Sequence, residues 1–468
     1  MGAIRLSKLF GLIKNEYIKQ LHKRSTLIIL VLVALGTIGF TGLIRISTLE
    51  YEDYYVGGEA DYTVDTEYVM EIKDATDNGD TAELEYYNYL RSEKISQFDW
   101  RKALADTAFD RSADVSDAAF VAASNYNGDA SELYKRFISE HDWRGYCEFL
   151  KDNIPESASW AVQYRLDNDV PLPDDKLSPD NDWRNDQLDY YLKNALIAEG
   201  TTDHRQKEHY EDMMLTAKYR VEHDVSYNIA GTSITDGDSG EFDDEEVDTR
   251  ITMYTAFSAS TMVVTFIGLL IIIIAGGTVA SEFSNGTIKF LLINPRSRGR
   301  ILVSKYITVI TAGYALIVIS YILALISSVV MFGADDIGAM YVRTTSGSTT
   351  AVPGPLYVFG QFMLSSIYVV VMATFAFALS SLVKSASLAI GLGIFLMTMG
   401  QGAVELLKEA FNIDAVRFTI FANSNLQSIA RGQTMFAGQT VGFALCIIAI
   451  HMIVFLLTAW DGFVRRDV

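Results

Sequence analysis

Residues 278–305 read TVASEFSNGTIKFLLINPRSRGRILVSK, a polar, charged segment with a glycine break between two long apolar stretches. The apolar stretches cover about Tyr254–Ala280 and Ile301–Phe332. Each is long enough to cross the roughly 30 Å hydrocarbon core of a bilayer as a helix. The segment therefore predicts a membrane protein in which a short, structured connection joins two spanning helices.

Four further apolar stretches have the length of spanning helices. They cover Thr26–Ile44, Leu356–Val383, Ala386–Glu405 and Gly438–Trp460. Together the six stretches predict an all-α membrane protein with six transmembrane helices, the first over 25–47 and the others within 253–468. The first stretch has no convincing small-residue cleavage site, so we interpret it as a retained anchor.

Residues 1–24 predict an amphipathic helix that does not span. Apolar side chains recur at steps of three and four, which places them on one helical face. They are Leu6, Leu9, Phe10, Ile13, Tyr17 and Leu21. The basic residues Lys8, Lys14, Lys19 and Lys23 lie mostly off that face, which is typical of a helix lying on an anionic membrane surface. Packing on protein is the alternative, and both can hold on opposite edges of the helix.

Charge divides the chain into two parts. Of its 58 acidic residues, 49 lie between Thr48 and Arg250, and of its 38 basic residues only 19 lie there. This stretch therefore carries −30, and the remainder carries +10. We expect residues 48–252, called the acidic domain below, to fold as a soluble helical domain that repels nucleic acid.

Four helical ranges are expected in the acidic domain: Thr81–Phe109, Ala130–Asp152, Trp183–Glu199 and Asp203–Asp224. Asp80 and Asp129 are the expected starts of the first two. The acidic run 235–248 lacks the ligand spacing of a calcium loop, and His204 and His209 are poorly spaced to share a metal. No metal site is predicted.

The distribution of Lys and Arg sets the expected orientation, because cytoplasmic loops are rich in them. Bases gather in the N-terminal segment, at Lys384 and at the C-terminal Arg465 and Arg466, and at the membrane surface in the connection after the second span, which has Lys289, Arg296, Arg298, Arg300 and Lys305. These four places all lie on one side if there are six spans. Both termini are therefore expected to be cytoplasmic and residues 48–252 extracellular, in a bacterial cell membrane.

The connection over 281–300, called the elbow below, predicts a helix–turn–helix unit facing the cytosol. Gly276 and Gly277 allow close helix approach before it, Asn285-Gly286 is a turn signal, and Pro295 ends its short amphipathic piece. A plain basic loop is the alternative.

The chain contains no G-x-x-x-x-G-K-[ST] motif, so we expect it not to hydrolyse ATP by that route. It is not predicted to be an enzyme. His451, in the last span, is either a structural hydrogen-bonding group or part of a transport path.

The elbow resembles the E-x-x-x-G-T-x-K-x-L-L-x-x-P-x-S-R pattern of ABC-2-type (type V fold) ABC transporter permeases. The matching residues are Glu282, Asn285, Gly286, Thr287, Lys289, Leu291, Leu292, Pro295, Arg296, Ser297 and Arg298, and the resemblance extends to Ser304 and Lys305 at the start of the next span. The interfacial helix, six spans and C-terminal Phe463-Val464-Arg465-Arg466-Asp467 are also similar to that family, as is a large insertion between the first two spans. The resemblance covers residues 1–47 and 253–468, and its Gram-positive members carry such extracellular insertions.

This resemblance implies an exporter permease whose elbow docks onto a separate ATP-binding cassette subunit that holds ATP and Mg. It also implies a second permease subunit, identical or not, and a re-entrant outer segment over 411–432. The cargo would be a peptide, drug or lipid-like molecule, with antimicrobial peptide export or immunity favoured. The alternative is a membrane-anchored peptide sensor acting through its extracellular domain.

Overall fold

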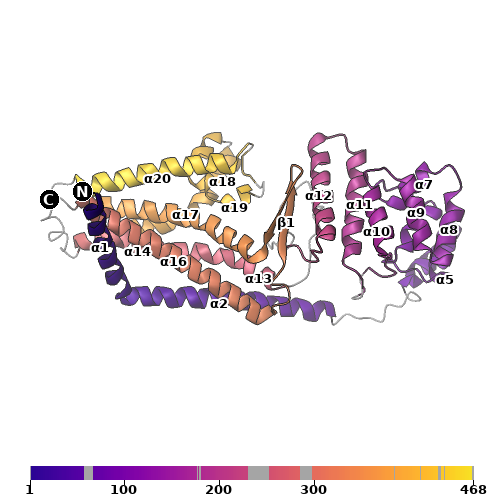
Figure 1. The fold of residues 1–468 in the computed structure, drawn as a ribbon, viewed down its shortest axis with the longest axis horizontal. Coiled ribbons are helices and arrows are strands. Elements are labelled where there is room, and N and C mark those ends of the chain that lie inside the picture. The colour runs from indigo at the N-terminus through magenta and orange to yellow at the C-terminus, as the bar shows by residue number, and fades with distance from the viewer. Residues whose placement is uncertain are drawn as a thin grey trace.

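The computed structural model describes residues 2–56, 67–176, 178, 181–229, 252–284, 298–383, 385–411, 413–430, 434–436 and 438–465. The molecule is elongated, with a bundle of long helices at one end and the helical acidic domain at the other (Figure 1). Helix α1 and the end of α20 lie together at the bundle end far from the acidic domain (Figure 1). This arrangement separates the two parts that the charge pattern had distinguished.

Six helices in the described residues are long and apolar enough to cross a membrane, which confirms the predicted fold class. They are α2 (Arg24–Val56), the continuous unit of α13 (Met253–Ala259), η2 (Ser260–Met262) and α14 (Val263–Ser284), then α16 (Arg298–Phe332), α17 (Gly354–Leu382), α18 (Ala386–Phe411) and α20 (Val441–Val464). Helix α2 runs beyond the span expected to end at residue 47.

Helix α14 lies centrally in the bundle and packs against α16, α17 and α18. A Cβ added at Gly276 would lie 3.2 Å from the backbone nitrogen of Ile390 in α18, so this glycine permits the close approach that was predicted. A Cβ added at Gly277 meets no atom of the described residues within 4 Å. Only one of the two glycines is therefore required for helix packing.

Hydroxyl groups join α2 to α16 within the bundle. Thr37 Oγ1 and Ser320 Oγ lie 2.9 Å apart, and Ser327 donates to Thr41 Oγ1 at 3.0 Å. All four side chains are buried. Because hydrogen-bonding groups in apolar surroundings need partners, these pairs fix the register between the two helices.

The N-terminal region forms helix α1 (Gly2–Leu21), which crosses the bundle end and packs on α16. Lys14 and Lys19 are exposed, as expected for a helix with a basic outer face. The side chain of Lys8 lies outside the described residues. The helix therefore contacts protein on one edge and presents lysines on another.

The acidic domain is helical, but two of its predicted helices are broken. Its helices are α4 (Val69–Asn78), α5 (Thr81–Ser92), α6 (Arg101–Ala108), α7 (Ala118–Asn125), α8 (Ala130–Glu140), α9 (Trp143–Asn153), α10 (Ser159–Asn168), α11 (Arg184–Gly200) and α12 (His204–Glu222). Asp80 and Asp129 accept hydrogen bonds from the first turns of α5 and α8, as predicted. The expected single helices end where Lys94 and His141 take left-handed backbone angles, which terminate a helix.

A β-hairpin between α16 and α17 departs from the all-α expectation. Strands β1 (Met340–Thr345) and β2 (Ser348–Pro353) are antiparallel, with Thr345 opposite Ser348. Ser346 and Gly347 form the two-residue turn, with φ of 50° and 74°. This is the left-handed geometry that a tight hairpin turn requires, and the flanking threonines and valines favour strands.

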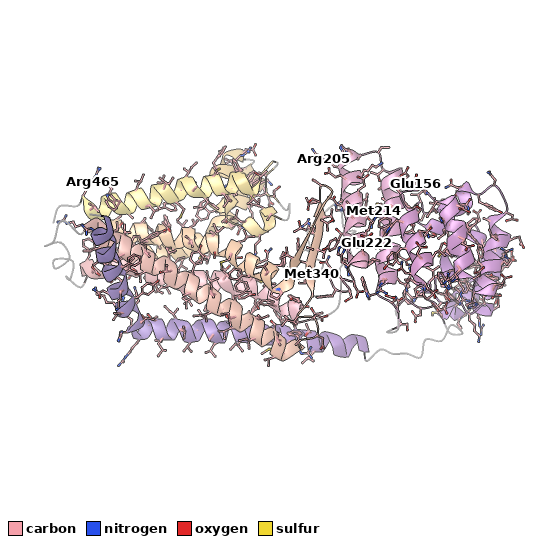
Figure 2. All side chains as sticks on the ribbon, in the orientation of Figure 1. Glu156, Arg205, Met214, Glu222, Met340 and Arg465 are labelled. Carbon is pink, nitrogen blue, oxygen red and sulfur yellow. The ribbon has the colours of Figure 1, made fainter. Side chains whose placement is uncertain are left out.

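The hairpin is hydrogen-bonded to the acidic domain. Asp212 in α12 accepts hydrogen bonds from the turn amides of Ser346 at 2.7 Å and Gly347 at 2.8 Å. Met340 at the base of the hairpin lies between the bundle and α12, where Met214 and Glu222 are found (Figure 2). The domain is thus seated on the ends of α16 and α17.

Residues 413–430 form short helical turns after α18 rather than another long helix. They are η4 (Asp414–Phe418), η5 (Phe421–Asn423) and α19 (Leu426–Ala430). The buried Asn423 donates to the carbonyls of Arg417 and Thr419, both at 2.8 Å, and so satisfies backbone groups that short turns leave unpaired.

Candidate functional site

The site is the bundle end where α14 finishes and α16 begins, the two boundaries of the elbow. Glu282 lies in the last turn of α14, and Arg298 is the first residue of α16. The other predicted elbow residues, namely Asn285, Gly286, Thr287, Lys289, Pro295, Arg296 and Ser297, lie outside the described residues. The site is therefore built from the groups at its two boundaries.

Lys305, in the second turn of α16, joins three helices through its ammonium group. Its Nζ lies 2.5 Å from Glu282 Oε1 in α14 and 3.1 Å from Glu16 Oε2 in α1. The Lys305 side chain is 3 % exposed, and those of Glu16 and Glu282 are 11 % and 18 % exposed. This Glu16–Lys305–Glu282 cluster, called the charge cluster below, connects the interfacial helix to both helices that flank the elbow.

Lysines of α1 and the turn after it surround the cluster. Lys19 Nζ lies 3.2 Å from Glu16 Oε1. Burial tends to raise the pKa of Glu16, but Lys305 and Lys19 outweigh it and hold that pKa below its ordinary value. Burial and the charge of Lys305 lower the pKa of Lys23. The two carboxylates of the cluster therefore face several ammonium groups at the protein's basic end.

Two further contacts fix the same helices. The hydroxyl of Tyr17 in α1 hydrogen-bonds Thr311 Oγ1 in α16. The Ser380 hydroxyl of α17 accepts from the backbone amides of Val279 and Ala280, at 3.1 and 2.9 Å, one turn before Glu282. A displacement of α14 at this end would therefore have to break the Ser380 contacts or move α17 with it.

Sequence reasoning had placed Lys305 at the membrane surface as one of the orienting bases and had not singled out Glu16. A signal for Glu16 existed, because it is the single acidic residue in residues 1–47. It also follows Ile13 by three positions, which places it beside the apolar face of α1. An isolated carboxylate beside an apolar face predicts a buried cationic partner.

His451 lies in α20, and its Nδ1 is 2.8 Å from the carbonyl oxygen of Ile447 one turn earlier. Its ring also lies edge-on to Phe455, with the ring centroids 6.2 Å apart. These contacts explain how a polar ring is accommodated in this helix. A role for His451 in a transport path stays a prediction. In the part of the chain that the structure describes, no group of three or more His, Cys, Asp or Glu side chains has the arrangement of a metal site.

The six apolar helices define a multi-pass membrane protein. Residues 241–468 match a family described as "Protein of unknown function (DUF2705)". The chain is 32% identical over 264 residues to the "Uncharacterized protein YhcI" of Bacillus subtilis (strain 168), a match covering 56% of this chain and 77% of that protein. It is 33% identical over 200 residues to the "Uncharacterized membrane protein YdbK" of the same bacterium, covering 42% of this chain and 76% of that protein.

The chain belongs to the DUF2705 family of bacterial membrane proteins and is related to YhcI and YdbK. No solved structure matches it.

Proposed function

We propose that this protein is the transmembrane permease subunit of an ATP-binding cassette exporter. The observation that carries the proposal is the charge cluster, which joins the interfacial helix to both helices flanking the elbow. Two of its three members, Glu282 and Lys305, belong to the elbow pattern that resembles ABC-2-type permeases. A motor subunit pressing on the elbow would thereby move α1, α14 and α16 together.

The proposed partner is an ATP-binding cassette subunit that supplies ATP and Mg and docks on the elbow. A second permease subunit, identical or not, would complete the transport path across the bilayer. The chain itself would perform no ATP hydrolysis, because it has no phosphate-binding glycine loop. Its role would be mechanical and selective rather than catalytic.

The proposed orientation puts the elbow and both termini in the cytoplasm and the acidic domain outside the cell. Its support is the gathering of α1, the elbow boundaries and Arg465 at one end of the bundle, opposite the acidic domain (Figure 2). Lysines and arginines concentrate at that end, as cytoplasmic segments do.

A peptide, drug or lipid-like molecule is the proposed cargo, with antimicrobial peptide export or immunity favoured. The −30 balance of the acidic domain attracts cationic molecules and repels acidic ones. The seat of this domain on α16 and α17 also supports a second candidate, a peptide sensor that signals through a membrane partner.

Purification of the tagged full chain from its native membrane in mild detergent, followed by mass spectrometry, separates these candidates. A stoichiometric ATP-binding cassette protein is expected. Recovery of a histidine kinase or another receptor in its place would sink the exporter proposal and favour the sensor.

Charge reversal at the elbow tests the docking surface itself. Arg296→Glu with Arg298→Glu should lower transport-coupled ATPase activity of the purified complex while membrane insertion is retained. The matched control is Arg205→Glu with Lys207→Glu, which changes charge equally on α12 of the acidic domain. Equal ATPase activity in both double variants would argue against docking at the elbow.

A further inference from the structure

The outer edge of strand β2 has unpaired backbone groups, whereas the other edge of the hairpin is bonded at Val342 and at the Thr344 amide. In a hairpin with a two-residue turn, the pair flanking the turn is hydrogen-bonded and the pairs then alternate. Thr345 and Ser348 flank this turn. The pairs Thr344–Thr349 and Val342–Ala351 therefore direct their amides and carbonyls away from the hairpin.

On β1 three of these four outward groups, the Val342 amide, the Val342 carbonyl and the Thr344 amide, have partners. Asn228 binds Val342 twice, accepting from its amide and donating to its carbonyl, both at 2.9 Å. The amide of Thr344 donates to Thr216 Oγ1 at 3.1 Å. With Asp212 on the turn, these bonds hold the hairpin rigidly against the acidic domain.

On β2 the equivalent outward backbone groups are not paired in this way. Among the described residues, none hydrogen-bonds the outward backbone amides and carbonyls of Thr349 and Ala351. Pro353, the next outward position, has no amide to satisfy and ends the strand. Residues 348–352 carry no charge, and such a strand lacks the lysines that usually block edge pairing.

We propose that the β2 edge binds an extended peptide segment as an added third strand. A rigid, uncharged edge with spaced donors and acceptors is what strand addition recognises, through main-chain hydrogen bonds rather than a particular side chain. The rigidity conferred by Asn228, Thr216 and Asp212 lowers the entropy lost on binding. The site thus selects for backbone conformation.

Charge complementarity assigns the sign of that peptide. The hairpin is held by the acidic domain, and Asp335 and Asp336 precede it in the same connection. Such a field raises the local concentration of cationic segments and repels acidic ones. The occupant is therefore an extended cationic peptide. Only the role of this peptide as transported cargo rests on the proposed function.

Location supports the same occupant. The hairpin connects α16 to α17 and lies where the bundle meets the acidic domain (Figure 1). A peptide paired with β2 would lie beside the ends of two spanning helices. Tyr341 of β1 stacks on Tyr357 of α17, with ring centroids 3.8 Å apart, so strand and helix are in direct contact.

The test uses the full chain in phosphatidylcholine nanodiscs and a fluorescent, end-capped peptide of five Lys-Val repeats. A peptide of five Lys-Pro repeats keeps the charge but lacks half of the backbone donors. We expect the Lys-Val peptide to bind at least about tenfold more tightly, because several main-chain bonds depend on these donors. Hydrogen exchange of the outward amides of Thr349 and Ala351 should slow when it binds.

Ala351→Pro removes the outward amide without deleting a bond of the hairpin, and Ala351→Val retains that amide. The first should weaken binding of the Lys-Val peptide about tenfold and the second by less than twofold. Unchanged exchange protection of the β1 amides of Arg343 and Thr345, which pair with β2, verifies that the hairpin remains folded in both variants.

Three results would overturn the proposal. The first is equal affinity of the protein for the Lys-Val and Lys-Pro peptides. The second is equal affinity of Ala351→Pro and wild type for the Lys-Val peptide. The third is slow exchange of the Thr349 and Ala351 amides in peptide-free protein, which would indicate a second copy covering the edge. The assay contains no ATP-binding subunit. Its failure is therefore distinguishable from failure of the exporter proposal, which the purification experiment tests.

Discussion

Lys305 Nζ lies 3.1 Å from Glu16 Oε2 although the two residues are 289 positions apart. The same ammonium group reaches Glu282 at 2.5 Å. One buried lysine therefore joins the first helix of the chain to the two helices on either side of the elbow. Removing one partner of a buried ion pair leaves an uncompensated charge, so substitutions in the charge cluster should destabilise the folded protein.

Lys305→Met should destabilise the bundle by roughly 3 kcal/mol, since it leaves Glu16 and Glu282 buried without their shared cation. Thermal unfolding in detergent measures this as a lowered midpoint. Lys14→Met is the control, because Lys14 is exposed on the same end of the protein. Equal midpoints for the two variants would show that the cluster contributes little.

Acid should loosen α1 from the bundle. The pKa of Glu16 is held below its ordinary value of 4.5 because Lys305 and Lys19 outweigh the effect of burial. A depressed carboxyl pKa stabilises the folded state above the unfolded pKa, and this stabilisation disappears as pH falls through the folded value. We expect faster hydrogen exchange in α1 as the pH falls below 4.5 and through the lowered pKa of Glu16. Glu16→Gln should flatten this dependence, and an unchanged profile in that variant would assign the effect to other groups.

Asp212→Ala should weaken the attachment of the hairpin turn to α12 by about 1–2 kcal/mol, because the carboxylate accepts hydrogen bonds from two turn amides and is partly exposed. Hydrogen exchange of residues 344–349 should accelerate, while that of α14 stays as in wild type. Glu211→Ala removes the neighbouring exposed carboxylate and serves as the control. Equal acceleration in both variants would indicate a general charge effect.

Gly354→Ala should destabilise the start of α17 by about 1–3 kcal/mol through overpacking. An added Cβ would lie 2.3 Å from Ile229 Cδ1 and 2.4 Å from Tyr254 Oη, whose hydroxyl donates to the Ile337 carbonyl at 3.0 Å. At Gly360, in the same helix, an added Cβ meets no atom within 4 Å in the part of the chain that the structure describes. Gly360→Ala should therefore be neutral or slightly stabilising. Thermal unfolding of the two variants gives the comparison, and a destabilised Gly360→Ala would contradict it.

The sequence by itself determined the six long helices, the amphipathic α1 and the helical acidic domain. Apolar length, helical periodicity and composition are local properties, and local properties are readable along the chain. Asp80 and Asp129 were likewise predictable as helix starts, because a capping carboxylate acts on amides two or three residues away.

Only the tertiary structure decided which distant groups meet. The contact of Glu16 with Lys305 depends on how α1 crosses α16, and that of Asn228 with Val342 depends on how the acidic domain is seated. Likewise, β1 faces α12 and the segment containing Asn228, and the opposite edge of the hairpin, on β2, has no partner among the described residues. Such pairings depend on packing between segments far apart in the chain, which no local pattern encodes.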